Sequence, residues 1–299
     1  YDRDRRPTAT VFPSGRVIRH MYAGGRLART ETPEGVVYFD YLCGGKLGSV
    51  VAGNEGIAYA YDGSLLTAES ASGTLNQAIS YAYDNDFGVI QATYAGQATG
   101  YDYDGDGLLI HAGNFSIARD GGNGLAVAIS DGRLALNRGF SAYGELASQA
   151  LVVGGRAVSS WALLRDEVGR IVRRSENVGG VAAAYDYLYD ANGRLAKVLK
   201  NNAAVEEYAY DENGTRVFET NAARGIAGRS YHYSAEDHLL KAGDWGCQYD
   251  ADGFLTQKAG PANPADQTRY AYSARGELLT VLLPDGRTTL YTGERLEMT

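Results

Sequence analysis

Residues Tyr185–Lys200 read YDYLYDANGRLAKVLK, and this stretch carries the pattern that decides the fold. Its three tyrosines stand at every second position, which is the period-two pattern of a β-strand. Residues 191–193 (Ala-Asn-Gly) then supply turn chemistry, and Leu195, Lys197 and Leu199 resume the alternation. The stretch therefore predicts a β-hairpin.

The turn of this hairpin is specified by its own residues. A three-residue hairpin loop requires a left-handed backbone at its last position, which Gly193 adopts without a steric clash. Asp190 opens the turn, where its carboxylate accepts the backbone N–H two residues on. Asp190 then lies opposite Arg194, and Tyr189 lies opposite Leu195. One face carries Tyr and Leu and the other carries Asp and Arg, and each such cross-strand pair contributes roughly 0.2–1 kcal/mol.

The same pattern recurs along the chain. Further copies are YDYDGDGLLI from Tyr101, YAYDENGTRV from Tyr208, QYDADGFL from Gln248 and YAYSARGEL from Tyr270. The turn glycines mostly fall about 20–25 residues apart, a period that indicates repeat architecture in which one unit cannot bury its own face. The residues expected to carry the repeat are Tyr103, Asp104, Gly107, Tyr187, Tyr189, Asp190, Gly193, Arg194, Leu195, Tyr210, Asp211, Gly214, Tyr249, Asp250, Gly253, Tyr272 and Gly276.

The motif Y-x-Y-D-x-x-G-R-L at this spacing resembles the YD repeats of RHS-repeat proteins. That family includes bacterial polymorphic toxins, the cocoon subunits of insecticidal toxin complexes, and teneurins. The resemblance implies an all-β fold of repeated β-hairpins that form a long, coiled β-sheet strip, part of a hollow shell that often encloses a C-terminal toxin polypeptide. It also implies a secreted or cell-surface location.

The repeat predicts one continuous YD-repeat β domain over residues 1–299. The expected blocks are a degenerate or frayed first repeat at 1–21, weaker repeats at 22–110, irregular repeats at 111–163 and the best-formed repeats at 164–299. The chain starts in the middle of a repeat and lacks the proline- and aspartate-rich signature that closes the family's shells. We therefore expect it to be a segment of a longer parent chain.

Two stretches depart from the pattern. The glycines around 121–124 predict an exposed loop between short strands. Residues 144–150 fit either a short helix or a turn followed by a strand. The strand is favoured because Tyr143-Gly144-Glu145-Leu146 resembles Arg275-Gly276-Glu277-Leu278.

Composition limits the partners. The chain has 28 Lys and Arg against 36 Asp and Glu, a net charge of −8, which argues against nucleic acid or an anionic membrane surface as a partner. No apolar run reaches the length of a membrane-spanning helix. A sheet this long must coil, and its exposed edges favour self-association with another copy.

The sharpest candidate for bound-ion chemistry is Asp102, Asp104 and Asp106 followed by Gly107. This spacing copies the start of a calcium-binding loop, but the twelfth position, which needs a bidentate carboxylate, falls on Gly113. An Asp-rich hairpin turn explains the same residues without a metal. We expect no cofactor.

Other reactive residues form no constellation. The two cysteines, Cys43 and Cys247, match no disulfide framework or metal motif, and we expect two separate free thiols in strands, with a bridge between them as the alternative. No metalloprotease motif or nucleophile elbow appears, and the many acidic pairs recur at turns, where capping explains them. We expect no enzymatic activity.

The leading interpretation is a structural segment of a YD-repeat shell that encloses or presents a toxin polypeptide. Its expected partners are the rest of the parent chain and an enclosed toxin domain. The alternative is a cell-surface adhesion module that binds carbohydrate or protein along its Tyr-rich strands, since the chain has 23 Tyr against 7 Phe.

Overall fold

A computed structural model describes residues 1–260 and 266–291 of the chain. Well over half of these residues lie in β-strands, and the single helical element among them is the 3₁₀ turn η1 (Ala222–Arg224). The prediction of an all-β fold built from repeated hairpins is confirmed. The end of the expected domain, residues 292–299, lies outside the described residues.

The chain divides into two compact units. Unit 1 combines Tyr1–Ala98 with Tyr233–Thr299, and unit 2 comprises Thr99–His232. Two strands, β10 and β22, contain the boundaries between the units.

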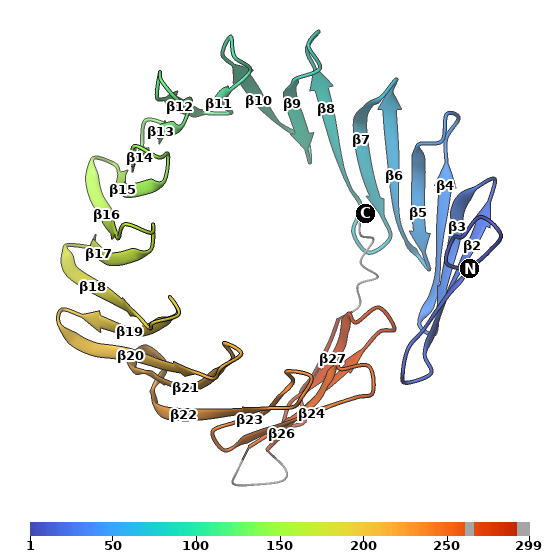
Figure 1. The fold of residues 1–299 in the computed structure, drawn as a ribbon. Coiled ribbons are helices and arrows are strands. Elements are labelled where there is room, and N and C mark those ends of the chain that lie inside the picture. Colours follow the sequence, from blue (N-terminus) through green and yellow to red (C-terminus); the bar gives the residue numbers. More distant parts are fainter. Residues whose placement is uncertain (261–265, 292–299) are drawn as a thin grey trace. The chain divides into compact units, whose positions relative to one another are not determined.

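Unit 1 contains two runs of antiparallel strands, and within each run every strand pairs with its neighbours in the sequence (Figure 1). The first run comprises β1 (Ala9–Val11), β2 (Val17–Ala23), β3 (Arg26–Thr32), β4 (Gly35–Tyr41), β5 (Leu47–Ala52), β6 (Glu55–Asp62), β7 (Leu65–Ser72), β8 (Gln77–Tyr83) and β9 (Val89–Tyr94). The second comprises β23 (Leu239–Ala242), β24 (Trp245–Tyr249), β25 (Leu255–Ala259), β26 (Gln267–Tyr272), β27 (Leu278–Leu282) and β28 (Thr288–Leu290).

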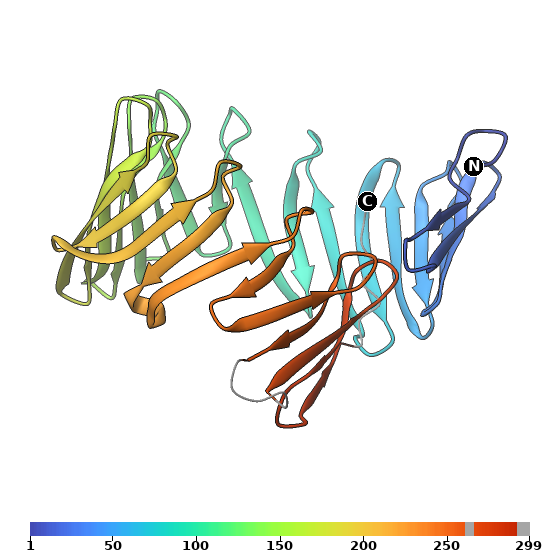
Figure 2. The ribbon, with the colours of Figure 1, turned by 60° about the horizontal axis from the view of Figure 1, so that its bottom comes forward.

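Unit 2 is one run of hairpins, which Figure 2 shows side by side with their turns at two opposite edges. Its strands are β10 (Gln97–Tyr103), β11 (Leu109–Ala112), β12 (Phe115–Arg119), β13 (Ala126–Ser130), β14 (Leu134–Phe140), β15 (Leu146–Val153), β16 (Arg156–Arg165), β17 (Ile171–Val178), β18 (Val181–Tyr189), β19 (Leu195–Lys200), β20 (Ala203–Tyr210), β21 (Arg216–Asn221) and β22 (Ile226–Tyr233).

The hairpin β18–β19 has the predicted turn but not the predicted alternation. Tyr189 pairs with Leu195 as expected, but the next strand position, Leu188, pairs with Lys197, so Ala196 forms a β-bulge. The bulge shifts the register by one residue. Val198 therefore faces Tyr187 and is only 3% exposed, so the expected continuation of the alternation to Leu199 is wrong.

This bulge is a general feature of the repeat. In each case the register shifts immediately before the tyrosine that precedes the turn, which places that ring at the edge of the sheet next to the turn. The tyrosines concerned include Tyr22, Tyr41, Tyr61, Tyr83, Tyr103, Tyr189, Tyr210, Tyr249 and Tyr272.

The apolar core is small, as a single-layer strip requires. Its largest cluster lies in unit 1, where Val37, Val50, Ala52 and Tyr59 are buried on one face of β4–β6. Partly buried neighbours from the same strands and β7 complete it. Most of the fold is therefore held by strand pairing and by side chains at the turns.

Both irregular stretches fold as predicted, and one expectation about the cysteines fails. A turn at 120–125 joins β12 to β13, and residues 146–153 form β15 and not a helix. Both cysteines are free thiols, as expected. Cys247 lies in β24, but Cys43 is exposed in the turn between β4 and β5, at the position that Ala191 takes in the turn between β18 and β19.

Among the described residues no helix is long and apolar enough to cross a lipid bilayer.

Candidate functional site

The repeat turn is organised by its aspartate. In the hairpin β18–β19, Oδ1 of Asp190 accepts the backbone N–H groups of Asn192 and Arg194, both at 2.9 Å. Oδ2 accepts Nε of Arg194 at 2.7 Å. The backbone hydrogen bond from Arg194, together with the ion pair to its guanidinium, lowers the pKa of Asp190. Gly193 has φ +78°, the left-handed conformation that the turn requires.

The other predicted repeat aspartates occupy the same position. The carboxylates of Asp104, Asp211 and Asp250 each accept the backbone N–H four residues further on, at 2.8–3.0 Å. The accompanying turn glycines all have positive φ: Gly107 +75°, Gly214 +86°, Gly253 +85° and Gly276 +83°.

In the turns of Asp166 and Asp190 the arginine joins two hairpins. The guanidinium of Arg194 lies 4.8 Å from the centre of the Tyr210 ring in the following hairpin and donates from Nη1 to the carbonyl oxygen of Asp211 at 2.9 Å. Arg170 lies over Tyr189 in the same way, at 4.7 Å. Each arginine thus binds the aspartate of its own turn and the aromatic ring of the next.

The tyrosine hydroxyl makes a second connection between hairpins. Tyr210 donates to the carbonyl oxygen of Leu195 at 2.8 Å, and Tyr189 donates to that of Ile171 at 2.7 Å. The acceptor is the first strand residue after the preceding turn, whose carbonyl lies next to the bulge. Equivalent bonds run from Tyr22 to Pro7, Tyr41 to Leu27, Tyr83 to Leu66 and Tyr249 to Leu239.

We call this arrangement the repeat clamp: the turn aspartate, the arginine four residues later, and the tyrosine of the following hairpin. Its members are side chains whose hydrogen-bonding capacity is used within the sheet. The remaining predicted positions support it, because Tyr187 packs opposite Val198, and Tyr272 pairs with Leu278 while its ring stacks on Phe254 at 5.2 Å.

The three candidate calcium ligands do not converge. Asp104 is engaged by the backbone N–H groups of Asp106 and Leu108 at 3.0 and 2.9 Å. Asp102 lies on β10 with its side chain 75% exposed, 3.7 Å from His111. In the described part of the chain, no group of three or more His, Cys, Asp and Glu side chains is arranged to hold a metal ion.

One turn of unit 1 receives its arginine from elsewhere. Four residues after Asp250 stands Phe254 in place of arginine. Arg16, from the turn between β1 and β2, donates from Nη2 to Oδ2 of Asp250 at 2.7 Å and from Nε to Oδ2 of Asp252 at 2.7 Å. Its guanidinium lies 5.3 Å from the centre of the Phe254 ring. These partners, more than 230 residues apart, could not be paired from the sequence.

A second contact joins the same two runs of unit 1. Glu34, in the turn between β3 and β4, accepts the backbone N–H of Ala274 at 3.0 Å. Ser273 and Ala274 are both buried, at 3% and 1% exposure. We call the Arg16 and Glu34 contacts together the seam.

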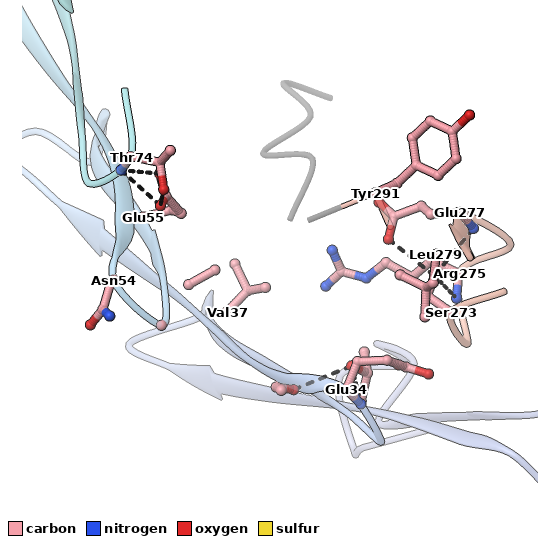
Figure 3. Close-up of a pocket in the computed structure, with 14 residues that line it drawn as sticks. Glu34, Val37, Asn54, Glu55, Thr74, Ser273, Arg275, Glu277, Leu279 and Tyr291 are labelled. Carbon is pink, nitrogen blue, oxygen red and sulfur yellow. Dashed lines mark hydrogen bonds between the residues drawn. The ribbon is translucent and has the colours of Figure 1, made fainter. Parts of the chain in front are cut away.

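A cavity of about 360 Å³ opens beside the seam. Figure 3 shows Glu55 and Thr74 on one side of it and Ser273, Arg275 and Glu277 on the other. Its acidic groups already have partners. Glu55 accepts Thr74 Oγ1 at 2.6 Å, and Ser273 Oγ lies 3.0 Å from Glu277. The described lining residues include no histidine or cysteine.

A buried acidic cluster in unit 2 carried no sequence signal. Glu219 on β21 is fully buried and pairs with Arg216 at 3.0 Å and Arg224 at 3.3 Å. Nearby, the hydroxyl of Tyr208 donates to the Glu206 carboxylate at 2.5 Å. Burial is the main cause, and this hydrogen bond the second, that raises the pKa of Tyr208 to about 12. These two ion pairs compensate the buried negative charge of Glu219, and removing either arginine would leave that charge poorly compensated.

Comparison with known proteins places this geometry in context. The family model described as Teneurin YD-shell matches residues 1–291. Teneurin-4 of Mus musculus is 29% identical over 287 residues, which cover 89% of this chain and 10% of that protein. Teneurin-3 of Danio rerio is 26% identical over 222 residues, 71% of this chain and 8% of that protein. The chain thus spans about a tenth of the length of these relatives.

Two solved structures share the fold. The Tc holotoxin pore of Photorhabdus luminescens matches with a TM-score of 0.68 at 12% identity, over 94% of this chain and 19% of that chain. The TcdB2-TccC3 crystal structure without its hypervariable C-terminal region matches with a TM-score of 0.69 at the same identity and coverage. At this identity the likeness shows a common fold.

Proposed function

The chain belongs to the Teneurin YD-shell family, and on that basis we propose that it is a wall segment of a YD-repeat shell, part of a longer parent protein. Such a wall encloses or presents a polypeptide of that parent. We further propose that residues 1–299 form one continuous YD-repeat unit with no catalysis of its own, outside the cell.

The observation that carries this proposal is the repeat clamp. Asp190, Arg194 and Tyr210 direct their polar atoms to one another and to the neighbouring backbone, not to a pocket. The clamp occurs at two successive turns, those of Asp166 and Asp190, where it holds one hairpin against the next. The charged and polar side chains of the clamp therefore stabilise the contact between hairpins of the wall.

The small apolar core supports the same role. The buried apolar cluster is confined to β4–β7. The other hairpins therefore depend on contacts with neighbouring hairpins for their stability. A wall segment has them on both sides along the strip, which suits a long shell and not an isolated catalytic domain.

Protease protection tests the proposal. The parent protein is digested with a nonspecific protease, and the cleavage rate of the segments flanking this chain is followed by mass spectrometry. The same flanking segments expressed alone are the matched control. We expect at least one flanking segment to be cleaved several-fold more slowly within the parent. Equal rates in both contexts would contradict an enclosing wall, and saturable binding of the intact parent on a glycan array would favour the adhesion alternative.

A further inference from the structure

The turn that contains Asp250 lacks one member of the repeat clamp. In two turns of unit 2 the aspartate binds the arginine four residues later: Asp190 binds Arg194 at 2.7 Å and Asp166 binds Arg170 at 2.8 Å. After Asp250 the fourth residue is Phe254. The hairpin β24–β25 therefore has no arginine of its own turn to pair with Asp250, as is also true of the turns of Asp104 and Asp211, where Leu108 and Thr215 take this position.

The place of that cation is surrounded by groups suited to a guanidinium. Asp250 and Asp252 contribute carboxylates, and the Asp252 side chain is only 1% exposed. Phe254 contributes an aromatic face. The backbone carbonyl oxygens of Tyr272 and Ser273 lie 3.3 and 3.4 Å from Nη1 of the arginine that occupies the place.

Arg16 is that occupant, and its local turn is shaped to deliver it. Ser14 donates its backbone N–H to Asp252 at 2.8 Å, and its hydroxyl donates to the same carboxylate. Nε of Arg16 contacts both Asp252 and the Ser14 hydroxyl. The arginine is thus held by its own turn and by the receiving hairpin at once.

We propose that Asp250, Asp252 and Phe254, with the carbonyl groups of Tyr272 and Ser273, form a guanidinium-binding site, and that its occupation by Arg16 is the latch that joins the run β1–β9 to the run β23–β28. The site selects a guanidinium over an ammonium group. A planar fork of donors binds two carboxylates and two carbonyls while its face lies on a ring, whereas a point charge satisfies fewer of these contacts. This inference is independent of what the shell contains.

Chemical rescue tests the latch on the full chain. We expect Arg16→Ala to lower the melting temperature by several degrees, and ethylguanidinium at millimolar concentration to restore most of the loss by filling the vacated site. Ethylammonium at equal ionic strength should restore little. Arg19→Ala is the matched control, because Arg19 is exposed on the adjacent strand β2. It should change the melting temperature little and show no rescue.

Local exchange keeps the test decisive if Arg16→Ala folds poorly. Arg16→Lys keeps the charge and removes the fork, and hydrogen exchange in this variant should quicken at 12–16 and at 250–254 while β15–β19 in unit 2 stay unchanged. An unchanged melting temperature and exchange pattern would overturn the latch. So would rescue of Arg16→Ala that persists when Asp252→Asn is added, or equal rescue by both cations.

Discussion

At the scale of single residues, the hydroxyl of Tyr210 shows how the repeat uses its tyrosines. It donates to the carbonyl oxygen of Leu195 in the preceding hairpin, one residue before the bulge at Ala196. We expect Tyr210→Phe to lower the free energy of unfolding by about 1 kcal/mol, the usual loss for one hydrogen bond. Urea denaturation measures it. Tyr143→Phe, at a side chain 91% exposed, is the control, and equal losses in both variants would contradict the role of the hydroxyl.

Gly193 tests the turn. Its φ of +78° disfavours any side chain, and an added Cβ would lie 3.4 Å from Nη1 of Arg170. Gly193→Val should cost about 1–2 kcal/mol through backbone strain. Gly105→Val is the matched change, because Gly105 has an ordinary φ and open space around its Cβ position. Thermal melts that show the same loss at both positions would mean that strain at Gly193 is not the cause.

At the scale of the hairpin, the aspartate turns make stability depend on pH. The pKa of Asp190 is lowered chiefly by the backbone N–H of Arg194. A carboxylate whose folded pKa lies below its unfolded pKa stabilises the fold above the unfolded value, and this contribution disappears as the pH falls through the folded value. We therefore expect stability to decline below about pH 4, the ordinary range for aspartate.

Asp190→Asn isolates this effect, because asparagine keeps an acceptor oxygen and loses the charge. The variant should be less stable than the parent at pH 7, and the gap should close as the pH is lowered through the acidic range. Urea denaturation across pH 2–7 measures it. Asp102→Asn, at the exposed side chain on β10, is the control. A constant gap between Asp190→Asn and the parent at every pH would refute the ion pair.

The hairpin β10–β11 provides a metal test. The carboxylate of Asp104 accepts hydrogen bonds from two backbone N–H groups of its own turn. The twelfth position of a calcium-binding loop requires a bidentate carboxylate, and here that position is Gly113. We expect EDTA to leave the melting temperature of the chain unchanged. A melting temperature that falls in EDTA and recovers with calcium would contradict this, and Asp106→Asn would then locate the ion.

Local chemistry explains which parts of these hairpins could be predicted. The turn at Asn192-Gly193 follows from residues within five positions of each other, so the sequence is sufficient to place it. The bulge at Ala196 is invisible to a period-two count, which assumes one partner per residue. Burial of Val198 follows from that bulge. Cys43 could have been placed in its turn from the repeat itself, because Tyr41 to Leu47 aligns with Tyr189 to Leu195 and Cys43 takes the position of Ala191.

At the scale of the whole molecule, the contacts that matter most lie beyond local reasoning. Arg16 and Asp250 are 234 positions apart, and no pattern in one hairpin states that its missing arginine comes from another. The buried Glu219 likewise depends on Arg224 of the 3₁₀ turn η1, an element with no signal in the repeat. The repeat motif was nevertheless sufficient to identify the family from the sequence, because its spacing is preserved through most of the chain.

The proposed role as a wall segment explains why the clamp and the seam join hairpins to one another. Hairpins clamped to their neighbours form a strip whose stability accumulates from nearest-neighbour contacts, as in other repeat proteins. Such a strip can grow long without a deep core. A segment that covers about a tenth of each teneurin relative fits this role as one stretch of a longer wall.

Electron cryomicroscopy of the parent protein tests the wall claim most directly. The account predicts that the hairpins of residues 1–260 and 266–291 belong to one continuous wall, with density for another part of the same parent chain against one face of the strip. A map in which these repeats stand apart from the rest of the parent, with both faces bare, would contradict it.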